Sequence, residues 1–158
     1  MQVINIYFLI INFFKGVSVI KNVLYSEDIK RTIEACQAFG AKIKCCDDYL
    51  EIEGASGVKR VEACINAGES GSTIRFMIPI MLTNSSRMKF IGENNLVNRP
   101  LDEYFDIFEE QEISYAHPLV ANLPLITEGG LKPDIYEIDG NVSSQFITGL
   151  LFALPLLD

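Results

Sequence analysis

Apolar and polar positions along the chain follow two spacings in turn, one typical of strands and one typical of helices. Residues 17–23 are β-branched and partly alternating, which predicts a strand. The serine and two acids at 26–28 are typical of a helix start, and Gly40 is a natural stop for that helix. Its apolar stripe consists of Ile29, Ile33 and Cys36. Residues 17–40 therefore predict a strand followed by an amphipathic helix.

The next segment predicts a hairpin and a second helix. Two short β-prone runs, 41–45 and 49–52, flank an Asp-Asp turn. A stretch of small residues at 68–75 then leads into an apolar run at 76–82, which we interpret as a helix. Pro79 lies inside that run and is expected to kink the helix.

The remainder of the chain continues the alternation. Residues 87–92 predict a strand, and an Arg-Pro pair leads into a helix over 101–110, where proline at the first turn is favourable. Further short strands are predicted at 113–116, 123–127 and 135–138. A last helix begins near Val142, and its apolar face consists of Phe146, Leu150 and Ala153. Strands that alternate with helices at short intervals predict an α/β (α+β) fold with helices packed on sheets.

Composition fits one globular domain and limits its partners. The 158 residues are 49% hydrophobic, which is enough for a sizeable core. The net charge of −8 argues against a nucleic-acid-binding surface. The four cysteines have no CxxC spacing and the single histidine, His117, precedes a proline. We therefore expect free thiols in a reducing cytoplasm and no metal site.

Residues 1–15 differ from the rest of the chain because 4–14 is an almost unbroken apolar run. The run is too short to cross a bilayer, which takes roughly 20 residues. No basic start or small-residue cleavage site marks it as a signal peptide. We interpret it as a buried helix or strand of a cytoplasmic protein with no membrane partner.

Three polar residues, Ser143, Ser144 and Gln145, stand directly before the apolar part of the last helix. Serine is a good N-cap, and a helix start presents unpaired N–H groups and a positive dipole end. Hydroxyls and an amide at such a place suit a phosphorylated or polyhydroxylated anion. A plain helix cap is the alternative, and this run alone does not decide between the two.

Two further positions add candidate anion contacts. Gly71 has no Cβ, so a ligand could approach its backbone closely. Its hydroxyl-bearing neighbours are Ser70, Ser72 and Thr73. Arg99 ends a loop that opens a helix, and its guanidinium could fork two oxygens of a carboxylate or phosphate. Arg75 either supports the same site or pairs with an acid such as Glu69.

Three blocks of sequence together resemble one enzyme family. They are Glu-Ser-Gly-Ser-Thr-Ile-Arg-Phe at 69–76, Asn-Arg-Pro-Leu at 98–101 and Val-Ser-Ser-Gln-Phe-Ile-Thr-Gly-Leu-Leu at 142–151. In this order they resemble 3-phosphoshikimate 1-carboxyvinyltransferase, also called EPSP synthase, and the resemblance runs from about residue 16 to the end. The last block is specific, because the related UDP-N-acetylglucosamine enolpyruvyl transferases share the fold but lack the Ser-Ser-Gln triple.

This resemblance implies a fold, a reaction and a set of site residues. The implied fold is part of one domain built of β-α-β-α-β-β repeats, an inside-out α/β barrel with helices inside. The family transfers the enolpyruvyl group of phosphoenolpyruvate to the 5-hydroxyl of shikimate 3-phosphate in the shikimate pathway, with no cofactor and no metal. By its pattern, Ser143, Ser144 and Gln145 would hold shikimate 3-phosphate. Gly71 would line the phosphoenolpyruvate pocket, and Arg99 would grip that substrate.

The chain departs from the family pattern at both ends. The apolar run stands where the family has a Lys-Ser pair and a nearby arginine, and the second half of the enzyme is absent. We therefore expect 16–158 to be a partial EPSP synthase-like domain that is inactive alone and self-associates through uncovered apolar side chains. Those expected to be uncovered are Leu150, Phe152, Leu154 and Leu156. The alternatives are a non-catalytic anion-binding or partner-binding remnant and one subunit of a split enzyme.

Overall fold

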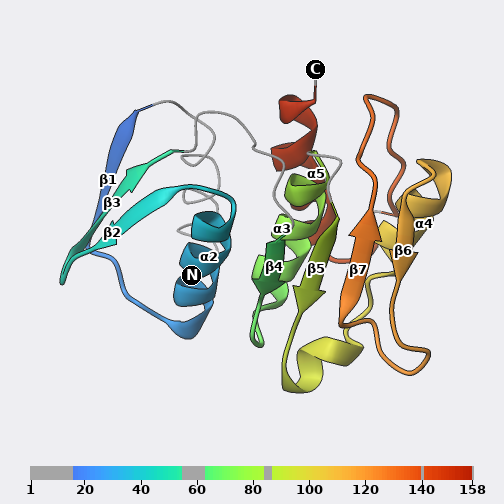
Figure 1. Cartoon of the computed structure of the whole chain (residues 1–158), viewed down its shortest axis with the longest axis horizontal. Coiled ribbons are helices and arrows are strands. Elements are labelled where there is room, and N and C mark those ends of the chain that lie inside the picture. The colour runs from blue at the N-terminus through green and yellow to red at the C-terminus, as the bar shows by residue number, and fades with distance from the viewer. Residues whose placement is uncertain (1–15, 55–62, 84–86, 140, 158) are drawn as a thin grey trace.

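The structure is a computed structural model that describes residues 16–54, 63–83, 87–139 and 141–157. The apolar run at 4–14, interpreted above as a buried helix or strand, lies outside the described residues. The described part consists of two sheets with helices packed against them, and its C-terminal end lies beside the helices of the second sheet (Figure 1). Within these ranges, no helix has the length and apolar character needed to span a membrane.

The first sheet holds three antiparallel strands in the order β1-β3-β2. They are β1 (Val17–Lys21), β2 (Lys42–Cys45) and β3 (Tyr49–Glu53). Helix α2 (Glu27–Ala38) begins where the Ser26 hydroxyl accepts a hydrogen bond from the backbone N–H of Ile29. It lies between the two sheets and contacts β2, β4 and α3 (Figure 1). The predicted strand, helix and hairpin of this region are confirmed.

The second sheet has the order β4-β5-β7-β6, in which only the β4–β5 pair is parallel. Its strands are β4 (Ala63–Asn66), β5 (Met88–Ile91), β6 (Ser114–Ala116) and β7 (Leu125–Glu128). The sequence analysis predicts three of these strands and misses β4. Strand β4 is four residues long and buries a single long apolar side chain, Ile65, so it shows no alternating pattern.

Helix α3 (Gly71–Leu82) is the central helix, since all 12 of its residues are buried. It begins at Gly71 and not at 76, because the Ser70 hydroxyl accepts from the backbone N–H of Thr73 and caps the helix there. A helix that is apolar all round is buried on every side. Helix α3 therefore fixes where the neighbouring elements can pack.

Pro79 lies inside helix α3 and changes its hydrogen bonding. Proline has no N–H, so the carbonyl of Arg75, four residues earlier, receives no helical hydrogen bond from position 79. The hydroxyl of Tyr104 donates to that carbonyl instead. A side chain from another helix thus satisfies the backbone group that Pro79 leaves open.

Helices α4 (Asp102–Glu110) and α5 (Ser144–Ala153) complete the layer behind the second sheet (Figure 1). Helix α5 packs along α3 more extensively than any other pair of elements in the described structure. The predicted face of α5 is confirmed, because Phe146, Leu150 and Ala153 are all buried. Two short 3₁₀ helices, η1 (Asn94–Asn98) and η2 (Leu154–Leu156), flank these elements.

The exposed apolar side chains of α5 are not the ones that the sequence analysis names. Leu150 is only 5% exposed, so its prediction as uncovered is wrong. Phe152, Leu154 and Leu156 are half-buried. The exposed stripe instead contains Ile147 at 40% and Leu151 at 64%.

The strand predicted at 135–138 is not formed. Ile135 is 84% exposed, so the apolar positions of this segment do not define a buried face. Side chains hold the segment instead of a strand ladder: the Tyr136 hydroxyl donates to the carbonyl of Lys132, and Asp134 accepts from the amide of Gln111 at 3.1 Å. The strand prediction from this short apolar pattern is wrong, because no described strand pairs with the segment.

Candidate functional site

The candidate site lies where two helix starts and one loop come together. Gly71 is the first residue of α3, and Ser143 is the N-cap of α5. Arg99 ends η1 in the loop that precedes α4. Helix starts carry partial positive charge and outward-pointing N–H groups, so two of them beside a guanidinium form an arrangement suited to anions.

Gly71 and Arg99 are in direct contact. A Cβ at position 71 would lie 2.6 Å from Nη1 of Arg99 and 3.5 Å from Nη1 of Arg75. Only glycine therefore allows the exposed guanidinium of Arg99 to lie over the start of α3. The sequence analysis placed Gly71 and Arg99 in one pocket, and the structure brings them together.

Arg75 links this contact to Gln145. Its Nη1 donates to the side-chain Oε1 of Gln145 at 2.9 Å, and its Nη2 donates to the carbonyl of Pro100 at 3.4 Å. Its guanidinium carbon also lies 4.8 Å from the ring centroid of Phe146. Arg75 therefore joins α3, the loop before α4, and α5. The structure does not form the pair with Glu69 that the sequence left open, because Glu69 accepts from Asn94, and the other role of Arg75, support of the site, stays a prediction.

The two serines before Gln145 have different surroundings. The half-buried Ser143 hydroxyl accepts from the backbone N–H of Gln145 at 3.4 Å, as an N-cap does. Ser144 is exposed, and its carbonyl accepts from the Thr148 hydroxyl at 2.9 Å. No hydrogen bond described here joins either serine to Arg99. The serines thus lie at the start of α5 beside the candidate site, and Gln145 is the member of the triple that contacts Arg75.

The site is electropositive although the whole chain is acidic. Neither Arg75 nor Arg99 takes part in the ion pairs found among the described residues. Burial lowers the pKa of the Arg75 guanidinium below its usual value, and the nearby positive charge of Arg99 lowers that pKa further. Two adjacent cations without a carboxylate are stabilised by an anion, so the arrangement favours an anionic ligand.

The hydroxyls next to Gly71 are buried and hydrogen-bonded to one another. Ser70, Ser72 and Thr73 are 2%, 7% and 1% exposed. Thr73 donates to the Ser70 hydroxyl at 2.8 Å and shares a hydrogen bond of 2.9 Å with the hydroxyl of Thr32 on α2. Thr73 therefore anchors the start of α3 to α2, and the suggestion that these hydroxyls suit an anion stays a prediction.

Tyr104 is the residue that the sequence analysis missed. It is 1% exposed, donates to the Arg75 carbonyl and reaches the Phe146 carbonyl at 3.5 Å. Its ring packs edge-on against Phe146, with 4.9 Å between the ring centroids. The only sequence signal is Pro79, which shows that the Arg75 carbonyl needs a partner but not which residue supplies it.

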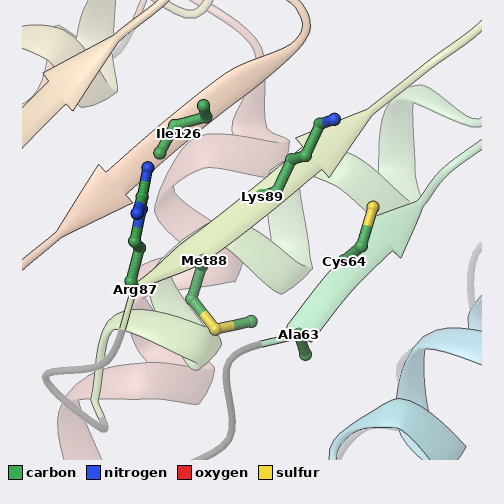
Figure 2. Close-up of a pocket in the computed structure, with 6 residues that line it drawn as sticks. All are labelled: Ala63, Cys64, Arg87, Met88, Lys89 and Ile126. Atoms are coloured by element: carbon green, nitrogen blue, oxygen red, sulfur yellow. The ribbon is translucent and has the colours of Figure 1, made fainter.

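A hollow on the outer face of the second sheet contains none of these residues (Figure 2). It is lined by Ala63, Cys64, Arg87, Met88, Lys89 and Ile126. Cys64, Lys89 and Ile126 are neighbours across three strands and point away from the helices, whereas Met88 is buried (Figure 2). Among the described residues, no group of three or more His, Cys, Asp or Glu side chains could hold a metal ion.

An α/β fold with an anion site between helix starts is found in many enzymes, and comparison with known proteins identifies which family this chain is in. The family model of EPSP synthase (3-phosphoshikimate 1-carboxyvinyltransferase) matches residues 7–158. The chain belongs to the EPSP synthase family. This confirms the resemblance carried by the three sequence blocks.

Relatives with the name 3-phosphoshikimate 1-carboxyvinyltransferase cover most of this chain. The protein from Clostridium beijerinckii is 47% identical over an alignment of 150 positions that covers 90% of this chain and 34% of the relative. The protein from Clostridium perfringens strain 13 is 50% identical over 144 residues, again 90% of this chain and 34% of the relative. The chain thus spans about a third of the length of the curated relatives that it matches.

The fold agrees with the same family. A solved EPSP synthase from Acinetobacter baumannii superimposes with a TM-score of 0.81 at 21% sequence identity, over 96% of this chain and 35% of that one. At this identity the similarity concerns the fold alone. The expected α/β fold, as part of the EPSP synthase architecture, is confirmed.

Proposed function

We propose that this chain contributes to the transfer of the enolpyruvyl group of phosphoenolpyruvate to the 5-hydroxyl of shikimate 3-phosphate. Ser143, Ser144 and Gln145 bind shikimate 3-phosphate in this proposal. Gly71 and Arg99 form the wall of the adjoining phosphoenolpyruvate pocket. The observation that carries the proposal is that Gly71 lies beside both Arg99 and Arg75, and that Arg75 bonds to Gln145, which joins three segments far apart in sequence.

The charges of the site fit the chemistry of these substrates. Both are anions with several negative oxygens, and they must be held side by side while a tetrahedral adduct forms and phosphate leaves. Two guanidiniums and two helix starts compensate that charge without a metal or an organic cofactor. Positioning and charge compensation account for most of the barrier reduction in this mechanism.

Calorimetric titration of the chain with shikimate 3-phosphate tests the proposal. We expect saturable binding that weakens at least tenfold in Ser144→Ala and in Gln145→Ala, because a hydrogen bond to a charged group contributes roughly 1.5–3 kcal/mol. Ser114→Ala and Gln37→Ala are matched controls, since both residues are exposed and lie on β6 and α2. Equal affinity in all four variants would contradict the assignment of the site.

Turnover separates the two alternatives that the sequence left open. The same chain is mixed with both substrates, and phosphate release is measured with and without the remaining part of the Clostridium beijerinckii relative. Release only in the mixture indicates one subunit of a split enzyme. Binding without release in either sample indicates a non-catalytic anion-binding remnant.

We also propose that the chain works in the cytoplasm and associates with itself through α5. Ile147 and Leu151 are 40% and 64% exposed on one stretch of this helix, and exposed apolar patches favour association. Light scattering should give a mass above that of a monomer, and Leu151→Lys should lower it. A monomer at every concentration would exclude this contact.

A further inference from the structure

Arg75 is held on several sides by the protein itself. It is 9% exposed, and its two terminal nitrogens donate to Gln145 Oε1 and to the Pro100 carbonyl. The Phe146 ring lies under its guanidinium, and Tyr104 holds its backbone carbonyl. Its Nε is buried without an acceptor in the described structure. A side chain with these constraints has one position and little contact with solvent.

This position fixes the orientation of the Gln145 amide. A guanidinium has donors only, so the atom of Gln145 that faces Arg75 must be the carbonyl oxygen. The amide nitrogen, with its two N–H donors, then points to the other side of the amide group. The flipped amide would place N–H groups against N–H groups and is excluded.

Arg99 and not Arg75 is the cation placed to meet a ligand. Arg99 is exposed and lies against the bare backbone of Gly71, whereas both terminal nitrogens of Arg75 already have protein acceptors. Arg75 therefore affects a ligand mainly through the residue that it orients. The half-buried Gln145 is that residue.

We propose that Arg75 is a positioning residue that locks the Gln145 amide with its N–H₂ group toward the anion site. The inference rests on the proposed function, since it assigns the donor with which Gln145 meets shikimate 3-phosphate. Arg75 thereby makes the site selective for a ligand rich in acceptor oxygens, because it keeps the two N–H donors of Gln145 facing that ligand.

A double-mutant cycle tests whether Arg75 acts through Gln145. Shikimate 3-phosphate affinity is measured by calorimetry for the wild type, Arg75→Met, Gln145→Ala and the double variant. We expect Arg75→Met to weaken binding about tenfold in the wild-type background and less than about twofold when Gln145 is already alanine. Arg87→Met is the matched control, because Arg87 directly precedes β5, is exposed and lies outside the site.

Two results, one from this cycle and one from Arg75→Lys, would overturn the positioning role. Additive losses would show that Arg75 contacts the ligand by itself, which overturns the positioning role and leaves the proposed function in place. Arg75→Lys retains a positive charge but replaces the fork by a single ammonium, so we expect it to restore only part of the affinity. Full recovery in Arg75→Lys would mean that charge and not orientation matters, and would also overturn the inference.

A measurement without ligand keeps the inference testable if Arg75→Met is less stable or if binding is absent. The side-chain amide signals of Gln145 are assigned by NMR from their loss in Gln145→Ala. In Arg75→Met or Arg75→Lys they should move toward the positions of an exposed glutamine, while those of Gln37 stay in place. Unchanged Gln145 signals would overturn the inference. Failure of the wild type to bind shikimate 3-phosphate would instead overturn the proposed function, and the NMR result would still decide the orientation.

Discussion

The same two helices, α3 and α5, meet in different ways at their middle and at their starts. At the middle, Gly149 of α5 lies against the backbone of Arg75, where an added Cβ would overlap the Arg75 carbonyl and lie 2.6 Å from the Tyr104 hydroxyl. At the start, the Cβ of an alanine at Gly71 would overlap only the tip of Arg99, while Nη1 of Arg75 would lie at an ordinary contact distance of 3.5 Å. The first contact is between backbones, and the second involves a flexible, exposed side chain.

The difference shows that glycine has two separate uses in this protein. Gly149 allows the helices to approach closely, and the hydrogen bond from Tyr104 to the Arg75 carbonyl belongs to the same contact. Gly71 leaves room over a helix start for a guanidinium and a ligand. Substitution should therefore affect stability at the middle of the pair and binding at its start.

Gly149→Ala should have the largest effect on stability. Overpacking against a backbone atom costs up to about 3 kcal/mol, and the better helix propensity of alanine returns about 1 kcal/mol, so a net loss of about 2 kcal/mol is expected. Urea unfolding followed by circular dichroism measures it. An unchanged unfolding midpoint would mean that α3 and α5 are not in close contact.

Tyr104→Phe should have the next largest effect. It keeps the ring that packs on Phe146 but removes the hydroxyl, which leaves the Arg75 carbonyl buried without a donor. We expect a loss of about 1.5 kcal/mol in the free energy of unfolding. Tyr115→Phe is the control, because the Tyr115 hydroxyl donates to the exposed Glu109 carboxylate at 3.0 Å. Loss of this exposed hydrogen bond should change the free energy of unfolding little. Equal losses in the two variants would argue against a special role of Tyr104.

The same hydroxyl predicts an alkaline loss of stability. Burial raises the pKa of Tyr104 well above its usual value of 10.0. Above pH 10.0 the unfolded chain releases this proton while the folded chain keeps it, so the stabilising contribution is complete below pH 10.0 and falls as the pH rises further. Through this one proton, the free energy of unfolding falls by at most about 1.4 kcal/mol per pH unit. Unfolding measured from pH 8 to 11 should show a shallower decline in Tyr104→Phe than in the wild type, and parallel curves would contradict this.

Gly71→Ala should have the smallest effect on stability and a clear effect on binding. The new methyl displaces only the end of Arg99, so the unfolding midpoint should shift by less than about 1 kcal/mol. Phosphoenolpyruvate affinity, measured with shikimate 3-phosphate present, should fall about tenfold because Arg99 loses its place. Unchanged phosphoenolpyruvate affinity in Gly71→Ala would show that Gly71 does not line the pocket, and the difference proposed between Gly71 and Gly149 would not hold.

Local sequence patterns determined most of the elements of this protein. The stripe of Ile29, Ile33 and Cys36 and that of Phe146, Leu150 and Ala153 both fix which helix face is buried, because a period of 3.6 residues needs no knowledge of the partner. The short segments are where local patterns fail. Four residues of β4 carry too little alternation, and the apolar pattern at 135–138 finds no neighbouring strand.

The sequence by itself determined the family and named the five candidate residues, since the three blocks can be read without coordinates. Only the tertiary structure decided that Gly71 contacts Arg99, that Arg75 bonds to Gln145 and that the Tyr104 hydroxyl replaces the N–H missing at Pro79. The physical reason is that hydrogen bonds and steric contacts depend on distance in space. Residues 75 and 145 are 70 positions apart in the chain, and only the packing of α5 on α3 brings them to 2.9 Å.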